Sequence, residues 1–252
     1  MSPAAQTAAI TAAPPAAPSV PRAPATGLAF AATAVLVAQF SEPFFGAWLQ
    51  SQGVTEPPGW VRATWLPFYA LLMVLAFSSL GRLGRALWVT PLWALLALLP
   101  LLSVAWSIDP SLSLRRGVSL LLTMGLGYYL AVRFDWAGLW RVLTSGWAVL
   151  VVGSFGLALL VPQAGIMQAE HPGTWAGLWT HKNQLGAIMA LGAVLALGAV
   201  VYSPGQRRRW ALIGCGCVLL VGLSTSKTAM VILALGAGLF AALLLAQVSR
   251  PL

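Results

Sequence analysis

The chain has 252 residues, of which 59% are hydrophobic and only 8% are charged, and its formal net charge is +9. A soluble domain carries about a quarter of its residues as charged side chains, so this composition excludes a soluble globular enzyme, and the hydrophobicity excludes a disordered chain. The apolar runs are long and do not alternate with polar residues, which also excludes a transmembrane β-barrel. We therefore expect an all-α fold, a polytopic bundle of transmembrane helices.

Residues 1–26 are rich in alanine and proline and are predicted to form a disordered cytoplasmic tail. Residues 27–252 are predicted to form the transmembrane domain. Ser41-Glu42-Pro43 interrupts its first apolar run, and the fourth run is so short that we expect its helix to extend at one end. Because a spanning helix needs roughly 20 residues, the runs predict about eight spans: 27–49, 64–80, 86–106, 117–132, 142–162, 184–203, 210–225 and 228–247.

The basic residues between the apolar runs predict the orientation of the chain. With the N-terminus inside, the cytoplasmic side receives nine basic residues and one acidic residue, whereas the outside receives five basic and four acidic residues. Because cytoplasmic loops are enriched in Lys and Arg, both termini are predicted to lie inside. The inside set is Arg22, Arg82, Arg85, Arg133, Arg141, Arg207, Arg208, Arg209, Arg250 and Asp135; the outside set is Arg62, Arg115, Arg116, Lys182, Lys227, Glu42, Glu56, Asp109 and Glu170.

Neither the basic residues as a group nor the cysteines and tryptophans indicate a binding site. The basic residues stand singly or in short clusters, which is typical of topology signals rather than of nucleic-acid binding. Cys215 and Cys217 lie two residues apart in an apolar run, on different sides of a helix, and indicate neither a disulfide nor a metal site. Tryptophans near the ends of the runs predict an aromatic belt at the membrane interfaces: Trp48, Trp60, Trp65, Trp106, Trp136, Trp140 and Trp210.

Four cations on the outside are not explained by the positive-inside rule: Arg115, Arg116, Lys182 and Lys227. Any one of them could extend its flexible side chain to a lipid headgroup. Four cations at helix ends on the same face favour an anion site instead, and a pyrophosphate presented from the outer leaflet would suit it.

The arginine pair follows an Asp109-Pro110 turn, after which a serine is expected to cap the next helix. The alternative is an ordinary loop before a capped helix. Paired arginines near a helix N-terminus are electrostatically unfavourable unless an anion binds there, so the pair indicates anion binding. A tight turn at 223–229 carries Lys227, which can reach a phosphate.

The loop and helix start at 170–186 gather two histidines, a glutamate, a lysine and two tryptophans in a chain with few polar groups. A lone histidine in a loop is usually just solvated, but the cluster favours function. Its Glu170, His171 and His181 are the candidate catalytic residues, since each can act as a general base.

Three stretches resemble motifs of the O-antigen ligase/polymerase superfamily, in the same order and topology. They are W-S-I-D-P-S-L-S-L-R-R at 106–116, G-T-W-A-G-L-W-T-H-K-N-Q-L-G at 173–186 and L-S-T-S-K-T-A at 223–229. The branch that they resemble most is that of the exopolysaccharide polymerases of the ExoQ type, and the resemblance covers residues 64–247. It implies an inner-membrane, metal-independent glycosyl-transfer protein without a cofactor, acting on polyprenyl-pyrophosphate-linked sugars at the periplasmic face.

Carried over by motif position, the resemblance implies that the pyrophosphate is held by Arg115 or Arg116, by Lys182 and by Lys227, with His181 and Asn183 as further motif members. Ala176 stands where many relatives have an arginine. Relatives also continue with a large periplasmic loop and further spans. We therefore expect this chain to correspond to the N-terminal half to two-thirds of a member, and to be inactive alone.

The resemblance implies a function in exopolysaccharide or O-antigen biosynthesis, by polymerising or ligating lipid-linked oligosaccharides. An acceptor hydroxyl would attack the anomeric carbon while polyprenyl pyrophosphate leaves, and cations would stabilise the charge on the leaving group. The expected partners are the lipid-linked glycan, the bilayer and other polysaccharide-assembly proteins, and not nucleic acid. The alternative is a non-catalytic membrane protein, either a transporter or a partner subunit of a polysaccharide export system. The few ionisable groups inside the spans argue against a transporter.

Overall fold

The computed structural model describes residues 27–42, 53, 59–168 and 170–248. The expected tail at 1–26 and residues 43–49 of the first expected span lie outside these residues. Within them every regular element is a helix, apart from one isolated antiparallel bridge between Ile166 and Trp175. The prediction of an all-α fold is confirmed.

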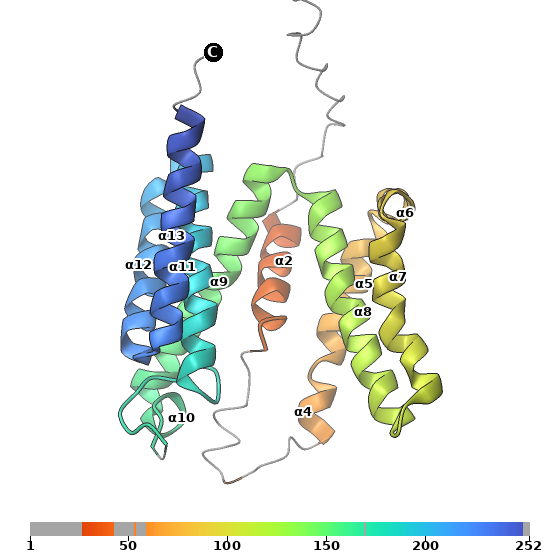
Figure 1. Ribbon diagram of the computed structural model, residues 1–252, viewed down its shortest axis with the longest axis horizontal. Coiled ribbons are helices and arrows are strands. Elements are labelled where there is room, and N and C mark those ends of the chain that lie inside the picture. Colours follow the sequence, from red (N-terminus) through yellow and green to blue (C-terminus); the bar gives the residue numbers. More distant parts are fainter. Residues whose placement is uncertain (1–26, 43–52, 54–58, 169, 249–252) are drawn as a thin grey trace, which may run out of the picture.

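Most of the described helices follow one another with short connections, but a longer segment, 166–181, joins α10 to α11 (Figure 1). Their bounds are α2 Gly27–Gln39, α4 Gly59–Ala63, α5 Leu66–Phe77, α6 Leu80–Val89, α7 Pro91–Leu102, η1 Ser103–Trp106, α8 Pro110–Arg133, α9 Trp136–Leu160, α10 Pro162–Gly165, α11 Lys182–Tyr202, η2 Pro204–Gln206, α12 Arg207–Ser224 and α13 Lys227–Val248.

The long helices form two groups (Figure 1). In one group, α11 packs against α12, α13 and α9; in the other, α8 packs against α7, α6 and α5. Helix α2 lies between the groups and contacts both α9 and α5. The core of the first group includes the fully buried Val142, Leu150, Leu185 and Met189.

Small residues allow the helices of the first group to approach closely, as is usual where helices associate in an apolar medium. A Cβ at Gly192 would overlap the indole of Trp147, and a Cβ at Gly198 would overlap that of Trp140. Both glycines lie on α11 and both tryptophans on α9, so the tryptophan rings fill the space that the missing side chains leave.

Four of the described helices are long and apolar enough to cross a membrane: residues 59–77, Trp136–Leu160, Lys182–Tyr202 and the helix that begins at Lys227. The bent pair of α6 and α7 adds a fifth if it is counted as one span. These criteria support a membrane protein, but they do not confirm the expected number of about eight spans. Helix α12, for example, has the required length but begins with three arginines.

The expected boundaries are partly right. Helix α8 covers the short fourth run and extends it at its N-terminal end to Pro110, so the expected extension is confirmed. The third run was expected to be one helix over 86–106, and this is wrong. It is broken between α6 and α7 by a bend of 98°. Thr90 leaves the helical conformation, with φ −126° and ψ 56°, because it precedes Pro91, which disfavours the α-helical region in the residue before it.

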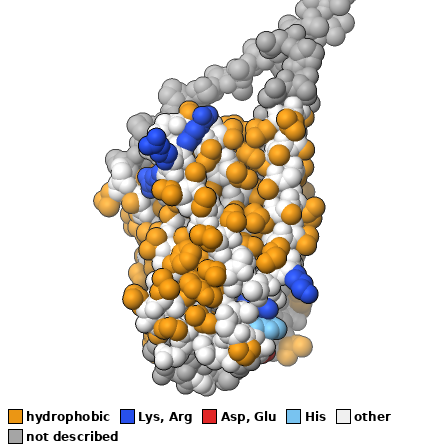
Figure 2. Space-filling model, turned by 90° about the vertical axis from the view of Figure 1, so that its left-hand side faces the viewer, with side chains coloured by type: hydrophobic (Ala, Val, Ile, Leu, Met, Phe, Trp, Pro, Cys, Tyr) orange, Lys and Arg blue, Asp and Glu red, His pale blue; other side chains and the backbone are white. Residues whose placement is uncertain are grey.

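The described basic residues of the inside and outside sets lie at opposite ends of the bundle, because successive long helices run in opposite directions (Figure 1). Figure 2 shows Lys and Arg side chains gathered at one end of one face, and His side chains beside Lys or Arg at the other end. The aromatic-belt prediction is only partly right. Trp60, Trp106 and Trp136 are exposed, but Trp210 is buried, with the Arg209 guanidinium 4.8 Å from its ring centroid. Both cysteines are free, as expected.

Candidate functional site

The segment between α9 and α11 is held onto the end of the first helix group by backbone hydrogen bonds. The N–H groups of Ala176 and Gly177 both donate to the carbonyl of Gly165, at 3.0 and 2.9 Å. The Trp175 N–H donates to the Leu223 carbonyl at 3.2 Å. The segment is therefore fixed both to α10, which packs against α9, and to the end of α12.

The same segment also contacts the turn after α2 and the interior. The Trp179 indole N–H donates to the carbonyl of Ser41 at 3.0 Å. Gly177 has φ +59°, and a Cβ there would come within 2.8 Å of Ser154 on α9. Ala176, where the resemblance leads one to expect an arginine, is 2% exposed. An arginine would not fit this buried position without rearrangement.

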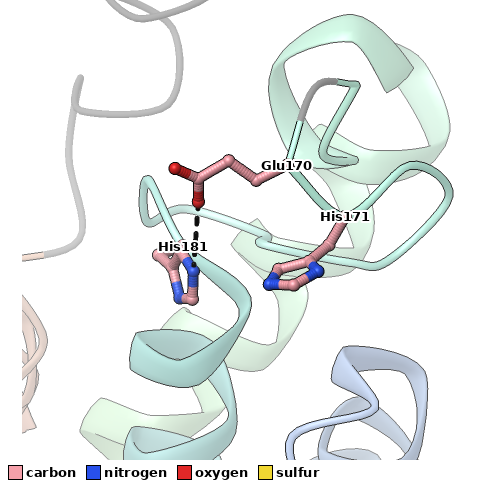
Figure 3. A group of neighbouring side chains, drawn as sticks. All are labelled: Glu170, His171 and His181. Carbon is pink, nitrogen blue, oxygen red and sulfur yellow. Dashed lines mark ion pairs between the residues drawn. The ribbon is translucent and has the colours of Figure 1, made fainter.

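Glu170, His171 and His181 form one cluster at this end, which we call the acid–imidazole cluster (Figure 3). Glu170 Oε2 lies 3.6 Å from His181 Nε2, and the two imidazole rings meet edge to face at a centroid distance of 5.8 Å. His171 begins a turn closed by the Thr174 N–H, which donates to the His171 carbonyl at 3.2 Å. Gly173 has φ +81° in this turn, a conformation that glycine adopts without strain.

His181 is also the N-cap of α11, which its sequence position did not predict. Its Nδ1 accepts the Asn183 backbone N–H at 3.1 Å. In the neutral imidazole only one nitrogen carries a proton, so this hydrogen bond assigns the proton to Nε2, which faces Glu170. His181 is therefore oriented at both nitrogens.

The three ligand atoms of the acid–imidazole cluster lie within 4.8 Å of one another, a spacing that a metal ion could draw together. A metal at His181 Nε2, however, would require the proton at Nδ1, where the Asn183 N–H already points. The hydrogen bonding of this donor set therefore fits a carboxylate–imidazole pair better than a metal centre. Within the described part of the chain, nothing hydrogen-bonds the His171 imidazole, so its nitrogens are available to a substrate.

Lys182 and Lys227 stand in the first turns of α11 and α13, at the same end of two helices that pack against each other. The helices meet at Gly186, where a Cβ would come within 2.7 Å of Ala229 and 2.9 Å of the Ser224 hydroxyl. The expected tight turn between α12 and α13 is confirmed, with Thr225 in the left-handed region. Two helix N-termini and two ammonium groups therefore make this region electropositive.

Arg115 and Arg116 lie in the second turn of α8, and both are exposed. The cap of α8 is Asp109 and not a serine as expected: its carboxylate accepts the Leu112 N–H at 2.9 Å and the Ser111 hydroxyl at 2.9 Å. These two hydrogen bonds lower the pKa of Asp109 below its ordinary value, and the bond from Leu112 has the larger effect.

The structure thus brings some of the expected site residues together. Lys182 and the side chain of Asn183, which is exposed, are on α11 directly after His181, and Lys227 is on the neighbouring α13. Arg115 and Arg116 lie at the same end of the molecule but on α8, which belongs to the other helix group (Figure 1). Lys182, Asn183 and Lys227 therefore share one surface, which α11 and α13 form. Arg115 and Arg116 do not lie on these two helices.

No family model matches the chain, and neither a curated protein nor a solved structure was found to match it. The resemblance to the O-antigen ligase/polymerase superfamily therefore remains an expectation carried by three sequence motifs.

Proposed function

We propose that the chain is a multi-spanning protein of the bacterial inner membrane that binds a polyprenyl-pyrophosphate-linked glycan and takes part in its polymerisation or ligation. The observation that carries the proposal is the pairing of two lysine-bearing helix N-termini with the acid–imidazole cluster on one surface. A pyrophosphate needs cations and N–H donors, and a glycosyl transfer also needs a proton acceptor nearby. The three sequence motifs that resemble the superfamily fall on this surface and on the start of α8.

In the proposed topology both termini are cytoplasmic and the lysine-bearing surface is periplasmic. The proposal assigns one span each to eight helices, the number expected from the sequence: α2, α5, α7, α8, α9, α11, α12 and α13. Support comes from the unequal charge of the two ends, since the end with more arginines is the cytoplasmic one in most membrane proteins.

In the proposed reaction the acceptor oxygen forms a bond to the anomeric carbon as the bond from that carbon to the pyrophosphate oxygen breaks. Lys182 and Lys227 stabilise the negative charge on the departing polyprenyl pyrophosphate. His171 accepts the proton of the acceptor hydroxyl, because its nitrogens are not engaged by the protein. Glu170 and His181 hold each other in position beside it.

The first test measures binding of polyprenyl pyrophosphate to the full chain in nanodiscs. Because a hydrogen bond to a charged group contributes about 1.5–3 kcal/mol, Lys182→Ala and Lys227→Ala should each weaken binding by roughly 10- to 100-fold. Arg208→Ala removes the same charge at the opposite end and is the control, with unchanged binding. Unchanged binding in both lysine variants would overturn the proposed site. The double variant Arg115→Ala/Arg116→Ala then tells whether the pyrophosphate also reaches α8.

The second test separates binding from chemistry. His171→Ala should leave polyprenyl-pyrophosphate binding unchanged. It should abolish product formation from lipid-linked repeat units in proteoliposomes that also contain the membrane partners, since the chain alone is expected to be inactive. If the wild-type chain binds the lipid but forms no product, also in the presence of its membrane partners, the non-catalytic alternative would replace the enzymatic one.

A further inference from the structure

Helix α6, Leu80–Val89, differs in composition from the other helices of the second group. Val89 lies on the same face as the arginines, but the four other large apolar residues share one helical face: Leu80, Leu83, Leu87 and Trp88. Arg82 and Arg85 lie roughly half a turn away, on the opposite face. The helix is therefore amphipathic, whereas α7, which follows it, is apolar on all sides.

The protein covers little of this apolar face. Leu80 is 55% exposed, Leu87 is 42% exposed and Trp88 is 86% exposed. Leu83 is partly covered, and α6 packs against α8. The surface of α6 therefore has three sectors: one packs against the protein, one is exposed and apolar, and one carries the arginines.

The orientation of α6 is unusual as well. It makes an angle of 98° with the helix that begins at Pro91, so it runs across the bundle axis while α7 runs along it (Figure 1). Arg82 makes a long hydrogen bond to α8: its Nη1 donates to the carbonyl of Val132, in the last turn of that helix, at 3.5 Å. This turn belongs to the end where the other arginines gather. Arg85 is exposed and has no hydrogen bond or ion pair within the described residues.

We propose that α6 lies in the plane of the membrane interface and binds anionic phospholipid headgroups through Arg82 and Arg85. The apolar sector with Leu80, Leu87 and Trp88 then enters the upper acyl region, where an aromatic ring with an N–H is favoured. The helix crosses the bundle at the level of its basic end, and its cations match the negative headgroups of that leaflet. This inference rests on the proposed membrane insertion, and not on the proposed glycosyl transfer.

The first experiment measures the depth of spin labels on the full chain in nanodiscs, on single cysteines in a background without Cys215 and Cys217. A label at position 88 should be more accessible to oxygen than to a polar nickel reagent. A label at position 89, about 100° around the same helix, should show the reverse. A label at position 152, on the exposed side of α9, reports on insertion of the chain.

The outcomes are distinguishable. If position 152 is in the acyl region but position 88 is in water, the inference about α6 is wrong while membrane insertion stands, and an apolar protein partner becomes the occupant to seek. If position 152 is in water, membrane insertion itself fails. Equal accessibility at positions 88 and 89 would also overturn the in-plane orientation.

The second experiment measures retention of phosphatidylglycerol by the purified protein by native mass spectrometry. Each arginine near an anionic surface should contribute about fivefold in affinity, so Arg85→Gln should lower retention by that factor, and Arg82→Gln/Arg85→Gln by more. Arg85→Gln removes no hydrogen bond of the protein and is therefore the cleaner variant. Arg207→Gln/Arg208→Gln is the matched control at the same end of the molecule, on α12. An equal loss in both double variants would mean that charge alone attracts the lipid, and would overturn the assignment to α6.

Discussion

The contact between α9 and α11 depends on a glycine, and Gly192→Ala tests it. A Cβ at this position would overlap the indole of Trp147, which is 6% exposed and donates its N–H to the Ile188 carbonyl at 2.7 Å. The ring has to move, and its hydrogen bond is strained or lost.

Three contributions determine the size of the effect. Overpacking a buried interface costs about 1–3 kcal/mol, and loss of the indole hydrogen bond costs about 1 kcal/mol more. The higher helix propensity of alanine offsets about 1 kcal/mol. We therefore expect Gly192→Ala to lower the free energy of unfolding by about 1–3 kcal/mol.

Reversible unfolding in mixed detergent–SDS micelles measures this difference. Gly156→Ala is the matched control: a Cβ at Gly156, on α9, would have no atom within 4 Å, so the same substitution should be neutral or slightly stabilising. In a Trp147→Leu background, Gly192→Ala should lose most of its cost because the overlapping ring is gone. Equal costs at positions 192 and 156, or an unchanged cost in the Trp147→Leu background, would refute the reasoning.

Three further predictions concern the ends of the helices. The Asp109 carboxylate has a lowered pKa, so the protection that it gives the Leu112 amide should be complete above its ordinary pKa of 3.8 and lost as pH falls through the lowered value; hydrogen exchange measures this, and Asp109→Ala should abolish the pH dependence. In a cysteine-free background, an impermeant thiol reagent on intact cells should label a cysteine at position 168 and not one at 206; the reverse result would invert the proposed topology. Binding of polyprenyl pyrophosphate should persist in excess EDTA, because the hydrogen bonding of the acid–imidazole cluster disfavours a metal; loss that zinc restores would contradict this.

The sequence by itself determined the class of the protein and the kind of each element. Composition and the length of the apolar runs act locally, and they sufficed to predict an all-α fold and the approximate positions of the helices. Connections between successive antiparallel helices must alternate between the two ends of the bundle. The alternation therefore predicted which loops lie together, and the arginines distinguished one end from the other. The two free cysteines and the turn before Lys227 also followed from local spacing.

Tertiary structure decided how these elements meet. The sequence contained Pro91, but only the fold shows that the chain bends there by 98°, because the packing of α6 on α8 fixes its direction. Trp210 was expected at an interface; the neighbouring helices bury it. Such outcomes depend on contacts between residues that are far apart in the chain, which spacing along one helix does not contain.

The candidate site shows the same division. Residue types predicted Glu170, His171 and His181 as a chemical cluster, but the tautomer of His181 follows from its role as the cap of α11. All four outside cations looked equivalent in the sequence. Close packing at Gly186 joins the two lysine-bearing helix ends. The arginine pair is apart from them because α8 packs in the other helix group, with α2 between the two groups. The sequence predicted which charges lie at the same end of the helices, and the packing of whole helices decided which of them share a surface.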